Sequence, residues 1–242
     1  MSKTLYTIIT SALGILAIVL IDSVIIPAMK ASQKKEYVII ADHIEPRSIT
    51  NSLVKEVSKQ LRDYQASENK MKKRDVKITV VDLSTLNLPT LNASVSPAQA
   101  PIEDKSVKQW GQMVNSADGI IFLVPNYNQG YPAIFKNSVD LIWEPWHTKP
   151  VAVIGYSLYG EDGNNLINSF GDVLTIVKTE QVKPALYLPN VTHHSLFNAQ
   201  QEKELRELFD KLVNSSHKGN FITRIKNAVS STFMRMLLKF TN

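Results

Sequence analysis

Two short segments of this 242-residue chain carry side chains whose types and spacing could bind a ligand. The first, residues 42–51, places Arg47, Ser48 and Thr50 where an apolar run gives way to helical spacing. Free N–H groups and the dipole at a helix N-terminus attract a phosphate, and nearby hydroxyls and a guanidinium would assist. The same residues also suit simple capping of that helix by Ser48 or Thr50, with Arg47 in solvent.

The second segment, Pro125–Pro132, is dense in amides and tyrosines and directly follows the apolar run of residues 119–124. Side-chain amides can bind the polar edge of a heterocycle, and a tyrosine ring can stack on its face. The alternative is a plain turn in which Pro132 begins the next helix. A third segment, residues 156–163, follows another apolar run and is therefore a further loop in which to look for the site.

Five apolar runs of strand character alternate with five segments of helical spacing. The predicted strands are 37–41, 76–81, 119–124, 151–155 and 185–188. The predicted helices are 49–64, 107–114, 133–143, 163–178 and 199–213. This alternation predicts an α/β fold with a parallel sheet covered on both faces. We expect the flavodoxin-like, doubly wound order 2-1-3-4-5 for its five strands, which would bring the three segments together beyond the carboxyl ends.

The run Pro125–Asp140 resembles the signature P-x-Y-N-x-x-x-P-x-x-x-K-N-x-x-D of the NADPH-dependent FMN reductases. The variant Y-N-Q-G-Y-P, followed by E-P-W-H-T-K-P-V-A-V-I-G-Y, is most similar to the fungal NAD(P)H:FMN and quinone reductases of that family. The resemblance covers residues 37–213 and includes neither end of the chain.

The resemblance implies a role for nine residues in binding FMN. The residues implied to hold the phosphate are Ser48 and Thr50, with Arg47 as an approximate match. Those implied to surround the isoalloxazine ring are Pro125, Asn126, Tyr127 and Asn128 on one side and Tyr156 and Ser157 on the other. Lys136, Asn137 and Asp140 are expected to tie the motif helix to the fold.

Two segments depart from the pattern of the family. Residues 42–45 replace its usual Gly-Ser-x-Arg and place Glu45 where the arginine is expected. After the fourth predicted strand the family usually has Y-G-G-x-G-G, whereas this chain has Tyr156-Ser157-Leu158-Tyr159-Gly160, with Gly163 later. Glycines there let the backbone approach the flavin closely, so the larger side chains would narrow the pocket or pack over the ring.

The function implied is an FMN-dependent oxidoreductase that moves a hydride from NADPH or NADH, through the flavin, to a quinone or flavin acceptor. The cofactor supplies the chemistry, so neither a catalytic side chain nor a metal is expected. The altered loops leave open a second function, a flavodoxin-like FMN-binding or scaffold protein without turnover. A hydrolase is disfavoured because the sequence has no G-x-S-x-G motif. The family implies a homodimer, in which Trp143 and Trp146 are candidates for the contact or for the core.

The net charge of +5 belongs to the two ends of the chain. Residues 1–36 carry +2 and residues 217–242 carry +5, which leaves −2 for residues 37–216. A nucleic-acid partner is therefore not expected, because the central part has no excess of basic residues to neutralise phosphates. Basic residues beside apolar ones indicate a membrane surface instead.

Residues 5–29 contain one charged side chain, Asp22, and predict a transmembrane helix. About 25 helical residues span roughly 37 Å, enough for a hydrocarbon core of ~30 Å. A cleaved signal peptide and a buried or partner-binding helix are the alternatives. More lysines follow this segment than precede it, which favours a single-pass anchor with a cytosolic domain.

We therefore expect three parts. They are an anchor and basic linker over residues 1–36, a flavodoxin-like FMN-binding domain over residues 37–216, and a basic amphipathic tail helix over residues 217–242. The alternative for the tail is a helix packed on the domain or on a second copy.

Overall fold

The computed structural model describes residues 34–68 and 75–215. The predicted transmembrane helix and the predicted tail helix lie outside the described residues. Among the described residues, no helix combines the length and the apolar character needed to cross a bilayer.

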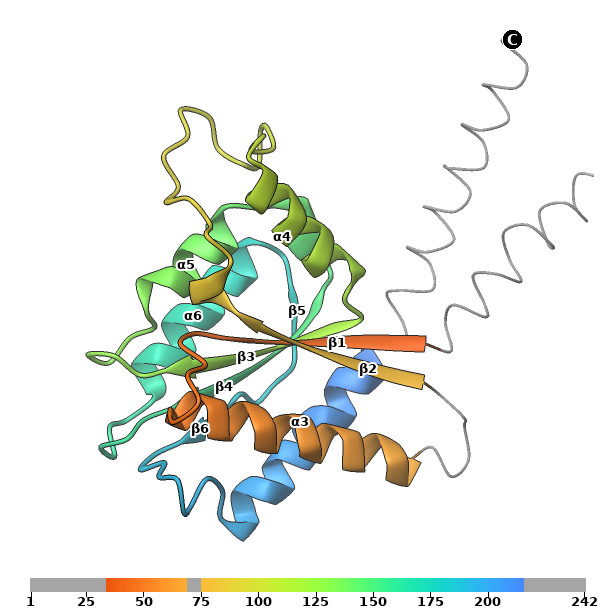
Figure 1. The fold of residues 1–242 in the computed structure, drawn as a ribbon, viewed down its shortest axis with the longest axis vertical. Helices are drawn as coiled ribbons and strands as arrows, with labels where there is room; N and C mark the ends of the chain where they lie inside the picture. The colour runs from red at the N-terminus through yellow and green to blue at the C-terminus, as the bar shows by residue number, and fades with distance from the viewer. Residues whose placement is uncertain (1–33, 69–74, 216–242) are drawn as a thin grey trace, which may run out of the picture. The chain divides into compact units, whose positions relative to one another are not determined.

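The described chain alternates strands and helices as the sequence predicted (Figure 1). The strands are β1 (Lys34–Ala41), β2 (Asp75–Asp82), β3 (Gly119–Pro125), β4 (Pro150–Tyr156), β5 (Glu180–Gln181) and β6 (Leu186–Leu188). The helices are α3 (Ile49–Glu68), α4 (Lys105–Ser116), α5 (Ala133–Asp140), α6 (Asn164–Ile176) and residues 199–215. Two short 3₁₀ turns, η2 (Leu83–Thr85) and η3 (Glu144–Trp146), complete the set.

The sheet has the predicted order β2-β1-β3-β4-β5. The pairings of β1 with β3 and of β3 with β4 are parallel, with Ile39 opposite Ile121 and Phe122 opposite Val153. The predicted fifth strand, 185–188, is present as β6 and pairs with β4, and a short additional strand that was not predicted, β5, pairs with the other end of β4. Pro184 lies between them, and a proline has no N–H to donate to a ladder.

Helix α5 ends at Asp140, three residues before the predicted end. The chain then enters η3, whose second residue is Pro145. A proline disfavours helical backbone in the residue before it, so the helical spacing of the sequence cannot continue as one helix. Trp146 is consequently turned into the core, where its ring meets Trp110 edge-on at 5.9 Å. Burial removes Trp146 from any contact with a second copy.

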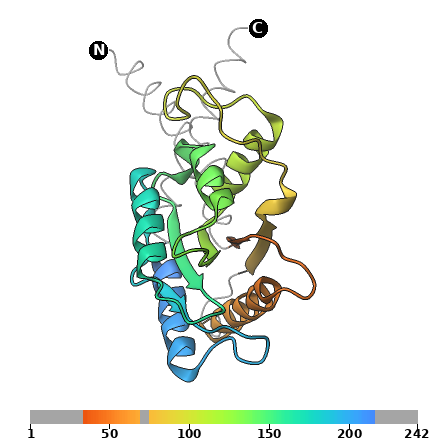
Figure 2. The same cartoon turned by 90° about the vertical axis from the view of Figure 1, so that its left-hand side faces the viewer.

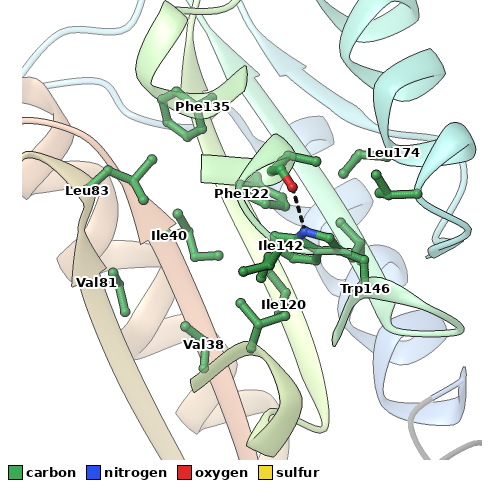
Figure 3. Packing of buried hydrophobic residues seen from close by; sticks show 14 of the residues in the cluster. Val38, Ile40, Val81, Leu83, Ile120, Phe122, Phe135, Ile142, Trp146 and Leu174 are labelled. Carbon is green, nitrogen blue, oxygen red and sulfur yellow. Dashed lines mark hydrogen bonds between the residues drawn. The ribbon is translucent and has the colours of Figure 1, made fainter. Parts of the chain in front are cut away.

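Each strand of the sheet's centre sends alternate side chains to opposite faces. On β3, Ile120 and Phe122 pack against α4, α5 and α6, whereas Ile121 and Leu123 pack against α3 and residues 199–215. Figure 3 shows part of the first layer, in which Phe122 lies among the other labelled apolar side chains. Both faces of the strands are buried, which explains why their sequences read as continuous apolar runs.

The three predicted ligand segments leave β1, β3 and β4 at the same edge of the sheet. They lie together on the left-hand side of Figure 1 and face the viewer in Figure 2. This placement follows from the parallel arrangement, since the carboxyl ends of parallel strands share one edge.

Candidate active site

A cavity of about 650 Å³ lies among these three segments. Eight of the nine residues predicted to bind FMN line it, namely Ser48, Thr50, Pro125, Asn126, Tyr127, Asn128, Tyr156 and Ser157. Six residues that were not among the nine also line it, namely His43, Glu45, Ile49, Leu158, Tyr159 and Glu161. Arg47 is exposed and lies outside the lining set. The volume is within the range of cavities that hold small ligands.

The N-terminus of α3 opens into this cavity. Ser48 caps the helix, because its Oγ accepts a hydrogen bond of 3.0 Å from the N–H of Asn51 and donates one of 2.9 Å to the carbonyl of Glu45. The N–H groups of Ile49 and Thr50 begin the helix and have no partner among the described residues. Two free N–H groups at the positive end of a 20-residue helix suit an anion.

The hydroxyl groups of Thr50 and Tyr156 meet at 2.7 Å in the buried floor of the cavity. Burial raises the pKa of Tyr156 to about 12, although the hydrogen bond with Thr50 opposes the shift. This contact joins the first turn of α3 to the end of β4 across 106 residues of sequence. It fixes the α3 side of the cavity relative to the β4 side.

The segment after β3 is a tight hairpin. Tyr127 and Gly130 exchange hydrogen bonds of 2.9 and 3.0 Å between their backbones. Asn128 and Gln129 both have positive φ, at 53° and 63°, as a two-residue type I′ turn requires. The hairpin holds the ring of Tyr127, which is 58% exposed, at the rim of the cavity.

Asn126 lies buried beneath this hairpin and connects the two ring-side segments. Its Nδ2 donates to the carbonyl of Asp162 at 3.3 Å and to the hydroxyl of Tyr187 at 3.0 Å. Its backbone N–H donates to the carbonyl of Tyr156 at 2.7 Å. The Oδ1 atom is buried and has no hydrogen-bond partner among the described residues. A donor on a bound heterocycle would satisfy it.

The segment after β4 is organised around Ser157, which is buried. Its Oγ is hydrogen-bonded to the carboxylate of Glu161 and accepts from the N–H of Tyr159 at 3.1 Å. Leu158 and Tyr159 lie at the rim, with 43% and 83% of their surfaces exposed. Ser157 therefore stabilises the conformation of its own loop. The large side chains of Leu158 and Tyr159 beside it face the open cavity.

The segment after β1 is held by Asp82, at the end of β2. Its carboxylate accepts from the N–H groups of His43 and Ile44 at 3.1 and 2.8 Å. Burial opposes ionisation of Asp82, but hydrogen bonds from Ser84, Ile44 and His43 outweigh it and lower the pKa of Asp82. The N–H groups of His43 and Ile44 are therefore already bonded to Asp82 and are not free to bind an anion. The unbonded N–H groups at the start of α3 are the remaining candidates.

His43 is the basic residue of the described cavity lining, in which Glu45 and Glu161 are the acids. Its Nδ1 lies 2.8 Å from Oδ1 of Asp42, and this contact raises the pKa of His43. The pattern of residue types in the sequence pointed to Arg47 instead. The positive φ of His43, which turns its side chain along the loop, has no signature in the sequence.

The motif helix is tied to the fold as predicted. Asn137 accepts from the N–H of Leu91 at 2.8 Å and donates to the carbonyl of Pro89 at 2.9 Å. Lys136 and Asp140 form an ion pair one helical turn apart. Asn137 therefore holds α5 against the loop before α4, whereas the Lys136–Asp140 pair stays within α5, and none of the three lines the cavity.

The arrangement as a whole provides a slot for a flat ring and an anion site at one end of it. Tyrosine and leucine side chains border the slot, a buried amide lies at its base, and the start of α3 closes the other end. The lining contains serine and histidine, but no hydrogen bond joins Ser48 or Ser157 to His43. The geometry therefore suits the binding of a planar cofactor rather than nucleophilic catalysis by a side chain.

Comparison with known proteins agrees with this geometry. The chain is 38% identical over 91 residues to the NAD(P)H-dependent FMN reductase LOT6 of Saccharomyces cerevisiae, which covers 35% of this chain and 48% of that protein. It is 31% identical over 138 residues to the NAD(P)H-dependent FMN reductase ntnL of Nectria sp, which covers 55% of this chain and 68% of that protein. The alignments thus span about half and about two thirds of these relatives, and the predicted resemblance to fungal enzymes is confirmed.

Among solved structures, the flavoenzyme FerB of Paracoccus denitrificans matches with a TM-score of 0.58 and 21% identity. The match covers 76% of this chain and 98% of FerB, and it shows the fold. Residues 36–193 match the profile described as NADPH-dependent FMN reductase, which covers more than half of the chain. The chain therefore belongs to the NADPH-dependent FMN reductase family.

Proposed function

We propose that the protein is an FMN-dependent oxidoreductase that moves a hydride from NAD(P)H to a quinone or flavin acceptor. The observation that carries the proposal is the single cavity that joins the rings of Tyr127 and Tyr159 to the start of α3. A ring-binding slot that ends at a helix N-terminus is what a flavin with a terminal phosphate needs.

Family membership implies FMN as the cofactor and NAD(P)H as the hydride donor. The residues present fit FMN at both ends. The free N–H groups of Ile49 and Thr50 would receive the phosphate, and the buried Oδ1 of Asn126 would accept from a ring N–H. When bound, the cofactor takes a hydride from the donor and passes it to the acceptor.

The protein's own part is to position and shield the ring. Asn126 is held by Asp162 and Tyr187, so its free oxygen points in one fixed direction. Tyr127 and Tyr159 lie at the rim of the cavity, where a nicotinamide or a planar acceptor would stack and exclude water. The hydroxyls of Thr50 and Tyr156 hydrogen-bond to one another. They therefore shape the floor of the cavity and do not supply a proton to the reaction.

A second candidate function is FMN binding without turnover. It is favoured by the two altered loops, since Leu158 and Tyr159 line the cavity and would hinder the approach of a nicotinamide to the ring, and since Glu45 and Glu161 line it whereas Arg47 does not. A carboxylate near the phosphate raises the free energy of the bound anion and weakens FMN binding. The two candidates differ in whether a nicotinamide can reduce the bound ring.

The proposal includes a location and an assembly state. A membrane-anchored protein with a cytosolic domain is supported by the apolar sequence of residues 5–29 and by the basic residues after it. Such an anchor would bring the cavity near membrane quinones. A homodimer is the state that the family resemblance suggests.

The test is anaerobic titration of the full chain, loaded with FMN, with NADPH and with NADH. Loss of the flavin absorbance near 450 nm, followed by its return when a quinone is added, is the expected result. A bound flavin that stays oxidised with both nucleotides would establish binding without turnover.

An Asn126→Ala variant should bind FMN about tenfold more weakly, since one buried hydrogen bond contributes about 1 kcal/mol or more.

A further inference from the structure

The described lining of the cavity holds one side chain that can become a cation near neutral pH, His43. It lies in the lining with Ser48, Ile49 and Thr50 of the start of α3, and no lysine or arginine is among the residues that the structure places there. Arg47, which the residue types in the sequence favoured for this role, is exposed and lies outside the lining. Any positive charge that this wall offers to a bound anion therefore comes from His43.

The backbone of His43 is held at the edge of the sheet. Its N–H donates to Oδ1 of Asp82, at the end of β2, at 3.1 Å. Its φ is 52°, in the left-handed region where histidine is one of the more frequent residues. The side chain is 65% exposed, so the ring stands at the surface of the cavity and is not packed in the core.

The ring is oriented by Asp42, which directly follows β1. Asp42 is only 5% exposed, and its Oδ1 lies 2.8 Å from Nδ1 of His43. Apart from this contact, Oδ1 has no polar partner among the residues that the structure describes. A buried carboxylate oxygen is stabilised by the hydrogen of a facing imidazole. Nδ1 therefore carries a hydrogen directed at Asp42 in both the neutral and the charged ring.

The other ring nitrogen, Nε2, is then the atom that changes with pH. In the neutral ring Nε2 presents a lone pair, which repels an anion. In the protonated ring it presents an N–H and a positive charge. No described residue forms a hydrogen bond with Nε2 of His43. Protonation thus converts this nitrogen from an acceptor into a charged donor that is free to meet a ligand.

The charged groups around His43 favour the protonated ring. The hydrogen bond and charge of Asp42, joined by the charges of Asp82 and Glu45, raise the pKa of His43, whereas burial opposes the rise. The other titratable groups that share the cavity lining are Tyr127, Tyr156, Tyr159 and Glu161. A ring with a raised pKa keeps its charge to a higher pH than an unperturbed histidine.

We propose that His43, oriented by Asp42, is the cation that pairs with the phosphate of FMN, so that the protein holds its cofactor tightly only while this imidazole is protonated. The inference rests on the proposed function, because it concerns the phosphate end of the same site. Glu45 stands where the family has an arginine, so the cation of this site has changed both its position and its type. An arginine stays charged at every physiological pH, whereas a histidine makes retention of the cofactor depend on pH.

The test is fluorescence titration of the full apoprotein with FMN and with riboflavin, which lacks the phosphate, between about pH 5.5 and about pH 8.5. At the acid end, His43→Gln should bind FMN about tenfold more weakly than the wild type, since it loses a charge-assisted hydrogen bond. This difference should shrink as the pH rises through the pKa of His43, because the wild-type ring then loses its proton. Riboflavin should bind equally to both proteins at every pH.

Three further variants define the origin of the effect. His43→Arg keeps a cation at every pH, so its FMN affinity should exceed that of His43→Gln by a similar factor across the whole range. Asp42→Asn removes the charge that favours the protonated ring, so the loss of FMN affinity should move to lower pH. His194→Gln changes an exposed histidine outside the lining and is the matched control. The phosphate itself titrates near pH ~6, so every variant is compared with the wild type at the same pH.

The outcomes separate this inference from the proposed function, because the titration needs no hydride donor. An effect of His43→Gln that is the same at every pH, or the same for riboflavin as for FMN, would overturn the pairing with the phosphate. Weaker FMN binding in Arg47→Gln together with unchanged binding in His43→Gln would assign the charge to Arg47 and overturn it as well. FMN that binds with the expected pH dependence but is not reduced by NADPH or NADH would overturn the proposed function and support the role of His43. Absence of FMN binding at every pH would overturn both.

Discussion

At the scale of single residues, the hydroxyl groups of the site bond mainly to the protein itself. Ser48 caps α3, Ser157 holds its own loop, and Thr50 and Tyr156 bond to one another. We therefore expect backbone N–H groups to bind an anion, and side-chain surfaces to bind a ring. This division follows from burial, because a buried hydroxyl without a partner costs about 1–3 kcal/mol.

The buried phenol of Tyr156 predicts a loss of stability at high pH. Its pKa is about 12 in the folded protein and 10.0 in an unperturbed tyrosine, so unfolding releases its proton between these values. The stabilising contribution is complete below pH 10 and is lost as the pH rises toward 12. Relative to Tyr156→Phe, the wild type should lose up to about 1.4 kcal/mol of unfolding free energy per pH unit in this window.

Urea unfolding at pH 8, 10 and 11, compared between wild type and Tyr156→Phe, measures this difference. Tyr159→Phe is the matched control, because it removes a phenol hydroxyl from a side chain that is 83% exposed. Parallel pH profiles for wild type and Tyr156→Phe would show that the phenol is not held protonated by the fold.

At the scale of elements, the start of α3 has two roles that can be separated. Ser48 stabilises the helix as its cap, and the N–H groups of Ile49 and Thr50 behind it are the proposed anion site. A substitution can remove the cap without adding charge, or keep the cap and add a negative charge. The two effects should then appear in different measurements.

Ser48→Ala removes the cap and should lower the unfolding free energy by about 0.5–2 kcal/mol. Ser48→Asp keeps a capping oxygen, so its stability should stay near wild type, whereas its carboxylate should weaken FMN binding by repelling the phosphate. Thermal unfolding of the apoprotein and fluorescence titration with FMN provide the two readouts. Equal FMN affinity in Ser48→Asp and wild type would place the phosphate away from α3.

The packing of the start of α6 against Tyr187 of β6 predicts a strong effect of one methyl group. In Gly163→Ala, the new Cβ would lie 2.2 Å from the ring of Tyr187, which must move and release Asn126. We expect a loss of about 1–3 kcal/mol in unfolding free energy and weaker FMN binding. Gly111→Ala is the control, because the nearest atom to its Cβ is 3.5 Å away and alanine favours the helix. Wild-type stability in Gly163→Ala would contradict this packing.

At the scale of the whole molecule, the residues that hold the sheet together are different from the residues that line the cavity. The two apolar layers on either side of the sheet hold the strands, and the cavity is built by loops beyond their carboxyl ends. Substitutions in the loops can therefore change the ligand without changing the fold.

The proposed anchor predicts where the full chain resides. Deleting residues 1–33, which leaves β1 intact, should release the protein from membranes, because the apolar run of residues 5–29 is long enough to span them. Sedimentation of membranes from cells that express the full and the shortened chain measures the distribution. Persistent binding of the shortened chain to membranes would point to the basic, amphipathic sequence of residues 217–242 instead.

The alternation of apolar runs and helical spacing by itself determined the fold class, because it depends on local periodicity. The strand order and eight of the cavity residues were predicted only through the resemblance to a known fold and family, since periodicity does not encode them. Only the tertiary structure decided how the segments pair with one another. Asp82 holds the N–H groups of the loop after β1, and Thr50 meets Tyr156 across 106 residues. Such contacts depend on strand register and side-chain packing between distant elements, which no local spacing encodes.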